Sequence, residues 1–193
     1  MRENGETRLE GYLEQQLLIA MPSMLDPNFE RSVTLMCQHT EQGAIGITIN
    51  RRSEFSLGEI FKQLDLECSD PAILETPVLE GGPVNPDRGF VLHTPVSGYE
   101  SSMEINPAIM VTTSRDVLVD IARGEGPEQF IMALGYAGWG DGQLESELRE
   151  NAWLSVPADS AIVYDWPFEE RWQRAFGTLG IDLSNLHGEG GRA

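Results

Sequence analysis

A short apolar run followed closely by glycines constrains this chain more than any other segment. Residues 130–134, Phe-Ile-Met-Ala-Leu, have the length and composition of a buried strand. Glycine permits backbone conformations and close approaches that other residues do not, so we expect the strand to enter a tight turn. Asp141 is placed to cap a short helix after it, with Leu144 and Leu148 on one face. The glycines of this predicted turn are Gly135, Gly138, Gly140 and Gly142.

Two tryptophans and several acids surround this glycine turn. We expect Trp139 and Trp153 to pack against the short helix. Backbone N–H groups at a helix start can hold an anion, but Asp141, Glu145 and Glu147 would oppose one. The glycine spacing matches neither a phosphate-binding loop nor a dinucleotide-binding fingerprint. The turn is therefore a candidate ligand site, and a purely architectural turn is the alternative.

Apolar runs and amphipathic helices alternate along the rest of the chain. The second and third runs below are close enough together to form a β-hairpin. Ser56 with Glu59, and Thr113 with Asp116, have the spacing of capping boxes and predict two helices, and a last helix is expected after Asp165. Because hairpins as well as helices join the strands, the sheet should be mixed rather than wholly parallel. The apolar runs lie at 17–21, 33–39, 44–50, 90–92, 109–112 and 161–164.

Length and cysteine usage fit one domain in a reducing compartment. A chain of 193 residues can bury roughly 70% of its unfolded surface, so we expect a single domain across 1–193 with flexible ends at 1–10 and 188–193. No run approaches the ~20 apolar residues of a membrane span and no signal-like segment opens the chain, which predicts a cytoplasmic protein. Cys37 and Cys68 form no Cys-x-x-Cys pair. We expect neither a metal site nor a cofactor.

The formal net charge of −18 argues against direct binding to nucleic acid. The 13 basic residues are spread along the sequence with one adjacent pair, Arg51 and Arg52, among 31 acids. An averaged field of this sign repels phosphate backbones. We interpret the acidity as a surface adaptation to solubility or salt, and the alternative is an acidic face that meets a basic protein partner.

One predicted strand carries a thiol and an imidazole. Cys37 and His39 are two residues apart, so a regular strand would place them on the same face. Cys37 is therefore a candidate reactive thiol with His39 as its base, although a buried structural cysteine is the commoner arrangement. The Gly-x-Ser-x-Gly, His-Glu-x-x-His and Ser-x-x-Lys motifs are absent. Hydrolysis by a standard motif is not expected.

Six sequence blocks occur in one order along nearly the whole chain: Met-Pro-Ser-Met-Leu-Asp-Pro-Asn-Phe-Glu-Arg-Ser-Val (21–33), Gly-Ala-Ile-Gly-Ile-Thr-Ile-Asn-Arg (43–51), Gly-Gly-Pro-Val (81–84), Gly-Phe-Val-Leu-His (89–93), Thr-Thr-Ser-Arg-Asp-Val-Leu (112–118) and Gly-Tyr-Ala-Gly-Trp-Gly-Asp-Gly-Gln-Leu-Glu (135–145). With these blocks the chain resembles the AlgH/YqgE family of bacterial proteins over residues 10–188. The resemblance implies an α+β fold whose mixed β-sheet is bent into a pseudo-barrel with flanking helices. It also implies a label of transcriptional regulator, linked to alginate production, and it supplies no established catalytic residues to carry over to this chain.

The end of the chain departs from that family pattern. A Gly-His-Ala ending is usual in the family, whereas this chain ends in Gly191, Arg192 and Ala193. A role that relatives assign to a terminal histidine therefore does not transfer to this chain.

From these observations we expect a non-enzymatic protein that binds a small ligand or a protein partner and has an indirect regulatory role. An enzyme that uses Cys37 or a carboxylate of Glu145 or Glu147 is one alternative, and a direct DNA-binding regulator is another. Convergence of the glycine turn, the 21–31 loop and His93 on one pocket with a perturbed thiol or carboxylate would favour the enzyme. The candidate binding residues are Asp26, Asn28, Arg31, Gly82, His93, Gly138, Trp139, Gln143 and Glu145.

Overall fold

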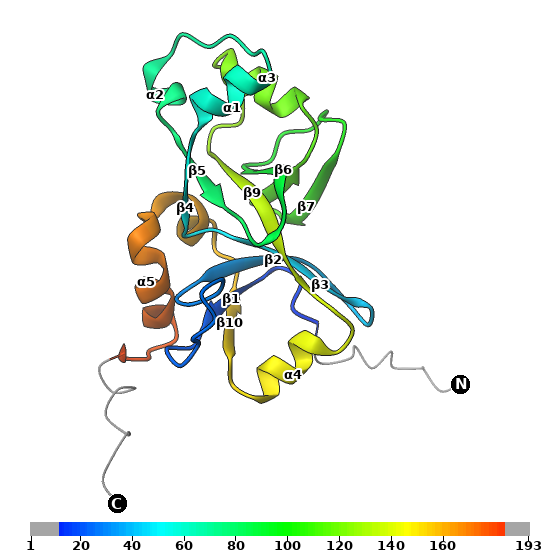
Figure 1. The fold of residues 1–193 in the computed structure, drawn as a ribbon, viewed down its shortest axis with the longest axis vertical. Helices are drawn as coiled ribbons and strands as arrows, with labels where there is room; N and C mark the ends of the chain where they lie inside the picture. The colour runs from blue at the N-terminus through cyan, green and yellow to red at the C-terminus, as the bar shows by residue number, and fades with distance from the viewer. Residues whose placement is uncertain (1–11, 184–193) are drawn as a thin grey trace, which may run out of the picture.

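A long strand, β9 (Phe130–Trp139), passes through the middle of the molecule and is shared by its two halves (Figure 1). It pairs antiparallel with β6 (Val84–His93), parallel with β5 (Pro77–Glu80) and, at its end, antiparallel with β3 (Gly43–Thr48). The computed structural model describes residues 12–183. Within that range, no helix is long and apolar enough to cross a bilayer.

The lower half of the molecule in Figure 1 is a set of antiparallel strands with two covering helices. Strand β1 pairs on one side with β10 and on the other with β2, and β2 forms a hairpin with β3. A π-helical turn and a 3₁₀ turn lead into the last helix. The elements are β1 (Gln16–Ala20), β2 (Val33–Thr40), α4 (Gln143–Arg149), β10 (Trp153–Pro157), the π-helical turn (Ala161–Asp165), the 3₁₀ turn (Phe168–Glu170) and α5 (Arg171–Thr178).

The upper half places three helices beyond the strands that surround the first part of β9 (Figure 1). Strand β6 lies between β9 and β8, and β8 pairs with β7. The remaining elements are β4 (Arg52–Ser56), α1 (Leu57–Gln63), α2 (Pro71–Leu74), β7 (Ser102–Asn106), β8 (Ile109–Thr112) and α3 (Asp116–Ala122).

The strands form one strongly curled, mostly antiparallel sheet in the order β10-β1-β2-β3-β9-β6-β8-β7, with β4 and β5 beside that path. The curl makes a half-barrel, and the parallel β5–β9 pair makes the sheet mixed. One apolar cluster, which includes Leu35, Leu92 and Phe176, joins both halves. Smaller clusters lie under α1 and α3 and under α4. The prediction of an α+β fold with a bent mixed sheet is confirmed.

Local sequence signals predicted some elements correctly. The β2–β3 hairpin is present, and Ser56 and Glu59 form the reciprocal capping box that opens α1. The second predicted capping box is wrong, because the N-cap of α3 is Arg115 and makes no side-chain cap. The carboxylate of Asp116 instead accepts hydrogen bonds from the Glu100 N–H and the Ser114 hydroxyl.

The strand predicted at 161–164 is also wrong, since Ala161–Asp165 is a π-helical turn. Its β-branched composition favoured a strand. The Asp159 carboxylate accepts the Ala161 N–H, and the Asp159 carbonyl accepts the N–H groups of Ile162 and Val163. Local hydrogen bonding from an aspartate therefore overrides the propensity of the residues that follow.

The predicted glycine turn is in fact mostly strand. Strand β9 continues through Gly135 and Gly138 to Trp139, and the N-cap of α4 is Gly142 at φ 69°, not Asp141. Gly135 has φ 76°, and a Cβ there would lie 2.4 Å from the Gly82 carbonyl oxygen. A Cβ on Gly82 would lie 2.1 Å from the Tyr136 carbonyl carbon. These glycines therefore let two backbones touch at the centre of the sheet.

We predict that Gly135→Ala lowers the free energy of unfolding by more than about 3 kcal/mol. A left-handed alanine costs about 1–2 kcal/mol, and its Cβ would also overlap the Gly82 carbonyl, which the paired strands hold in place. The matched control is Gly177→Ala in α5, where nothing lies within 4 Å of the added atom. Urea unfolding of both variants checks this, and equal stabilities would contradict the close crossing.

Candidate functional site

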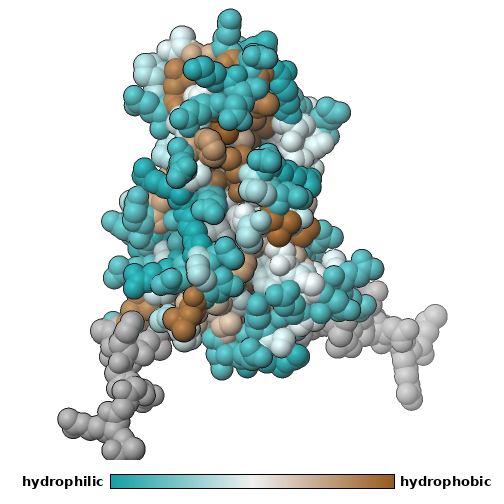
Figure 2. All heavy atoms as spheres, in the orientation of Figure 1, coloured by the Kyte–Doolittle hydropathy of each residue, from teal (hydrophilic) through white to brown (hydrophobic). Residues whose placement is uncertain are grey.

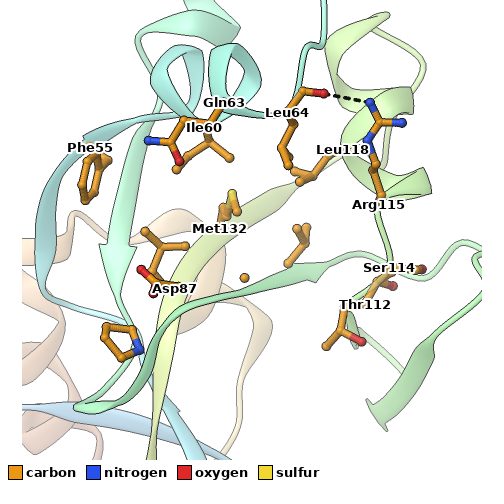
Figure 3. Close-up of a pocket in the computed structure, with 15 residues that line it drawn as sticks. Phe55, Ile60, Gln63, Leu64, Asp87, Thr112, Ser114, Arg115, Leu118 and Met132 are labelled. Carbon is orange, nitrogen blue, oxygen red and sulfur yellow. Dashed lines mark hydrogen bonds between the residues drawn. The ribbon is translucent and has the colours of Figure 1, made fainter.

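A pocket of about 440 Å³ opens between α1, α3 and the sheet (Figure 3). Its floor is apolar and comes from β6 and β9, with Val91 and Met132 buried. Ile60 of α1 and Leu118 of α3 form the opposite wall, and Phe55, which is 42% exposed, stands at the rim. Ligand sites in proteins typically have such a volume and a mainly apolar lining with a few polar groups.

The pocket exists because β6 leaves β9 over a short stretch. Val84 pairs with Tyr136, whereas the next β6 residue in register, Gly89, pairs with Leu134. The residues between them on β6 loop away from β9, and among them Pro86 and Asp87 line the pocket. Gly89 leaves room for the Met132 side chain, since a Cβ there would lie 2.9 Å from Met132 Cε.

Polar groups stand around the mouth of this pocket. The Arg115 Nη2 atom donates to the Leu64 carbonyl over 2.8 Å and ties α3 to α1 above the floor (Figure 3). Gln63 and Asp87 are exposed, and neither side chain hydrogen-bonds to another residue of 12–183. An amide and a carboxylate are thus available to a ligand whose body occupies the apolar floor.

The hydropathy of the molecular surface is consistent with a binding pocket in the upper half. Figure 2 shows hydrophobic residues grouped in a column that descends from the helices of the upper half along the middle of the molecule. Hydrophilic residues flank the column on both sides. A contiguous apolar patch with a polar rim is typical of a binding surface.

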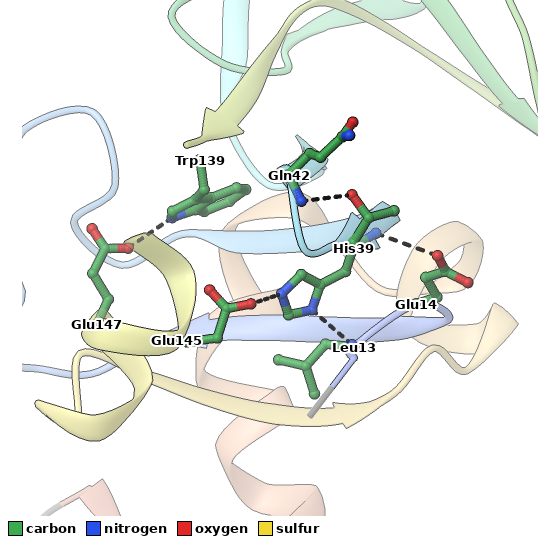
Figure 4. Close-up of polar contacts among 8 residues, drawn as sticks. Leu13, Glu14, His39, Gln42, Trp139, Glu145 and Glu147 are labelled. Atoms are coloured by element: carbon green, nitrogen blue, oxygen red, sulfur yellow. Dashed lines mark hydrogen bonds and ion pairs between the residues drawn. The ribbon is translucent and has the colours of Figure 1, made fainter. Parts of the chain in front are cut away.

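His39 belongs to a buried hydrogen-bond network (Figure 4). The ring is 2% exposed, its Nδ1 atom accepts the Leu13 N–H over 2.9 Å, and its Nε2 atom lies 2.6 Å from Glu145 Oε1. An acceptor at Nδ1 requires a neutral ring that donates its Nε2–H to the carboxylate. Tyr12 packs edge-on against this ring. Both nitrogens are occupied, so His39 has no lone pair left to act as a base.

Glu147 accepts hydrogen bonds from both tryptophans that the sequence predicted to lie near α4. Its Oε2 atom accepts the indole N–H of Trp139 at 2.7 Å and that of Trp153 at 3.2 Å. Both rings are nearly fully buried with Leu144. Phe29 stacks on Trp139 at a centroid distance of 6.0 Å and meets Trp153 edge-on at 5.7 Å. Rings in such contact leave no space for a ligand between them. The expected packing of Trp139 and Trp153 against α4 is confirmed.

His93 lies apart from this network, in the upper half of the molecule. Its Nδ1 atom donates to the Thr94 carbonyl over 2.8 Å, and its Nε2 atom is 2.6 Å from the Thr112 hydroxyl. That hydroxyl also contacts the Ser102 hydroxyl at 2.7 Å. Burial lowers the pKa of His93, against the opposing effect of the Thr94 hydrogen bond. The ring is therefore neutral near pH 7, and its nitrogens are satisfied internally.

Cys37 and His39 do not share a face, contrary to the sequence prediction. Met36 pairs with Gly46 and Gln38 with Ile45, so Cys37 is the extra residue of a β-bulge. The bulge turns Cys37 towards the half-barrel cluster while His39 faces α4. Burial raises the pKa of the Cys37 thiol to about 12. The thiol stays protonated at neutral pH and has no base beside it.

The candidate residues of the 21–31 loop have structural contacts of their own. The Asp26 carboxylate accepts the Asn28 N–H. The carbonyl of Asn28 accepts a hydrogen bond from Arg51, which also binds the carbonyls of Pro27 and Glu30. Arg51 therefore fixes this loop, and the Arg31 guanidinium lies over the ring of Trp172.

The remaining candidates are backbone or capping positions. Gly82 belongs to the β5–β9 crossing, and Gly138 pairs with Ile45 inside the sheet. The Gln143 side chain accepts the Gly140 N–H at the start of α4. Phe29 connects the 21–31 loop to the tryptophans. The predicted residues therefore do not converge on one pocket. Trp139, Gln143 and Glu145 lie at α4, whereas the Arg31 guanidinium lies against Trp172 of α5. Gly82 and His93 lie elsewhere.

Sequence reasoning missed the residues of the α1–α3 pocket. They come from five separate segments, and no local motif marks them. The signals in the sequence were two blocks noted for their resemblance, 89–93, which contains Gly89 and Val91, and 112–118, which contains Arg115. Gln63, Asp87 and Met132 lie in segments that look like an ordinary helix end, a polar turn and an apolar strand.

Fold and site together define an α+β protein with a curled half-barrel sheet and a ligand-sized pocket beside it. The AlgH-like family model matches residues 17–184, and the chain belongs to that family. UPF0301 proteins are close relatives. That of Xanthomonas campestris pv. campestris (strain B100) is 50% identical over 181 residues, covering 94% of this chain and 96% of the relative. That of Thioalkalivibrio sulfidiphilus is 52% identical over 178 residues, covering 92% and 95%.

Solved structures confirm the fold and the resemblance stated from sequence. The solution structure of the AlgH protein from Pseudomonas aeruginosa superposes with a TM-score of 0.77 at 47% identity and covers 100% of both chains. A crystal structure of a protein from Corynebacterium diphtheriae has a TM-score of 0.70 at 20% identity and covers 87% of each chain, which shows a shared fold.

We predict that Glu147→Ala lowers the free energy of unfolding by about 2–4 kcal/mol, because two buried indole N–H groups lose their acceptor. Glu147→Gln keeps an acceptor oxygen and should cost less than about 1 kcal/mol. Urea unfolding followed by tryptophan fluorescence compares the two. An equal loss in both variants would show that charge rather than the shared acceptor matters.

A second prediction concerns pH. Desolvation raises the pKa of Glu145, but hydrogen bonds from its own backbone N–H and from His39 outweigh this and hold the pKa below its ordinary 4.5. A depressed folded-state pKa gives stability that is complete above the unfolded pKa and is lost as pH falls through the folded value. Wild type should therefore lose more stability than Glu145→Gln on acidification from pH 5 to about pH 3. Glu150→Gln, an exposed change just after the same helix, is the control, and identical acid slopes for all three proteins would contradict the pairing.

Proposed function

We propose that this protein is a non-enzymatic small-molecule-binding factor whose ligand sits in the α1–α3 pocket. The observation that carries the proposal is the pocket itself, with its buried apolar floor and polar mouth. A ligand with an apolar body and one hydrogen-bonding end fits this lining. The body would lie over Met132 and Val91, and its polar end would reach Gln63 or Asp87.

The state of the titratable groups supports binding over catalysis. The Cys37 thiol is protonated, and both imidazoles described above use both of their nitrogens inside the protein. The carboxylates of Glu145 and Glu147 are each committed to ring N–H donors. General acid–base chemistry needs a group within reach of a substrate proton and poised near the working pH. The pocket brings no such pair together.

A regulatory role would then be indirect, through a ligand-dependent contact with another protein. The pocket lies between α1 and α3, so an occupant can change the distance between the two helices. The Arg115 contact to the Leu64 carbonyl bridges them directly. Direct recognition of DNA is not part of this proposal, because the chain carries a formal net charge of −18.

The test uses the neutral fluorescent amine N-phenyl-1-naphthylamine, whose emission rises in apolar surroundings. We expect saturable binding to wild type. Gly89→Leu should weaken it at least about tenfold, or roughly 1.4 kcal/mol, because the new side chain meets Met132 and fills the pocket. Gly140→Leu is the matched control, since the nearest atom to its added Cβ is the Gln143 side chain at 3.9 Å. Equal affinity of the Gly89→Leu variant and wild type would refute this site.

A further inference from the structure

Arginines gather around one cleft of this acidic chain. The sequence suggested that the 13 basic residues were scattered, but the fold brings several of them to α5 and to the residues between β3 and β4. Aromatic rings lie under four of the guanidinium groups. The arginines of this group are Arg31, Arg51, Arg52, Arg171 and Arg174.

The cleft itself measures about 460 Å³ and lies between the 21–31 loop, the start of the β3–β4 connection and α5. Arg31, Arg51, Phe168 and Trp172 all line it, and the Arg31 guanidinium lies over the Trp172 ring. It is separate from the α1–α3 pocket, with which it shares no lining residue. A ligand here would therefore be independent of the proposed function above.

Arg31 is held in position by its surroundings but has no acidic partner among the ion pairs of residues 12–183. Its backbone is left-handed at φ 53°, and its carbonyl accepts the Asn50 side-chain N–H over 2.8 Å. Its guanidinium lies 5.4 Å from the centre of the Trp172 ring, and that indole is anchored by donation to the Ala20 carbonyl at 2.8 Å. A guanidinium that lies over an aromatic ring retains N–H donors for a ligand.

The neighbouring arginines have different tasks. Arg51 donates hydrogen bonds to three backbone carbonyls and so fixes the loop that carries Arg31. Arg52 pairs with Glu169 at 3.3 Å. Arg171 is buried under Phe168 and donates to the carbonyls of Trp166 and Ile49. Each of them adds positive charge near the cleft without competing for a ligand at Arg31.

Arginines just outside the lining set the charge around the cleft apart from that of the whole chain. Among the lining residues, Arg31 and Arg51 balance Glu30 and Glu169. Arg52 and Arg171, which contact the Phe168 ring, add positive charge beside the cleft. Charges farther away than about 8 Å are largely screened at physiological ionic strength. A compact anion at Arg31 thus meets the arginines beside it, whereas a long polyanion would also meet the acidic surface around the cleft.

We propose that this arginine cleft binds the oxyanion of a small phosphate- or carboxylate-bearing molecule, with Arg31 as the bidentate donor. The planar fork of a guanidinium matches two oxygens of either group. The cleft is larger than a bare anion, and Phe168 and Trp172 line the space beside Arg31 that the rest of the ligand would fill. Phenyl phosphate and benzoate are therefore suitable probes, one for each oxyanion.

The experiment is a titration of the full chain with each probe, followed by NMR of the arginine Nε–H and tryptophan indole N–H signals. We expect saturable shifts at Arg31 and Trp172 with at least one probe, and the tighter probe identifies the oxyanion. Arg31→Gln should weaken binding at least about tenfold. Arg31→Lys, which keeps the charge but loses the fork, should weaken it by a smaller factor.

Arg174→Gln is the control, because Arg174 pairs with Glu170 and contacts Trp166 outside the cleft lining. It should bind as wild type does. Three results would overturn the proposal: no saturable shift with either probe, unchanged affinity in Arg31→Gln, or an equal loss in Arg174→Gln. None of these outcomes depends on the naphthylamine assay, so failure of one site leaves the other testable.

Discussion

The close crossing of β9 with the segment after β5 is the constraint on which the rest of the structure depends. Gly82 and Gly135 bring backbone atoms so near to one another that no side chain fits between them. At this point β9 leaves its partners in the upper half and continues to β3 in the lower half. The sheet curls there, and the half-barrel core forms inside the curl. Both candidate ligand sites lie on elements whose relative positions this crossing determines.

The two halves of the molecule use polar residues differently. In the lower half, His39, Glu145 and Glu147 form closed networks in which each described donor meets an acceptor, so they stabilise packing. Beside α1 and α3, polar groups such as Gln63 and Asp87 stand around an apolar space with no protein partner within the described range. Closed networks stabilise a fold, whereas open ones are available to ligands. This difference in hydrogen bonding, more than any sequence motif, distinguishes the residues that stabilise the fold from those available to a ligand.

The sequence predicted several local features correctly and missed features that depend on distant partners. The capping box at Ser56 and the β2–β3 hairpin are encoded within a few residues, and both were found. Gly135 was recognised as special but assigned to a turn, because its reason, Gly82, lies far away in the chain. Strict strand alternation would place Cys37 and His39 on the same face of β2. The β-bulge at Cys37 instead places them on different faces. The α1–α3 pocket arises because the β6 residues between Val84 and Gly89 do not pair with β9. The hydrophobic pattern of the sequence does not indicate this break in pairing.

The central claim is that the α1–α3 pocket, rather than the tryptophan and histidine networks, receives the ligand. Intermolecular nuclear Overhauser effects between N-phenyl-1-naphthylamine and the methionine methyl groups test it most directly. Met132 forms part of the pocket floor, Met36 is buried in the cluster under α4, and Met103 is exposed on β7. We predict cross-peaks from the probe to the Met132 methyl and none to that of Met36. Cross-peaks to Met36 or Met103 without any to Met132 would contradict the account.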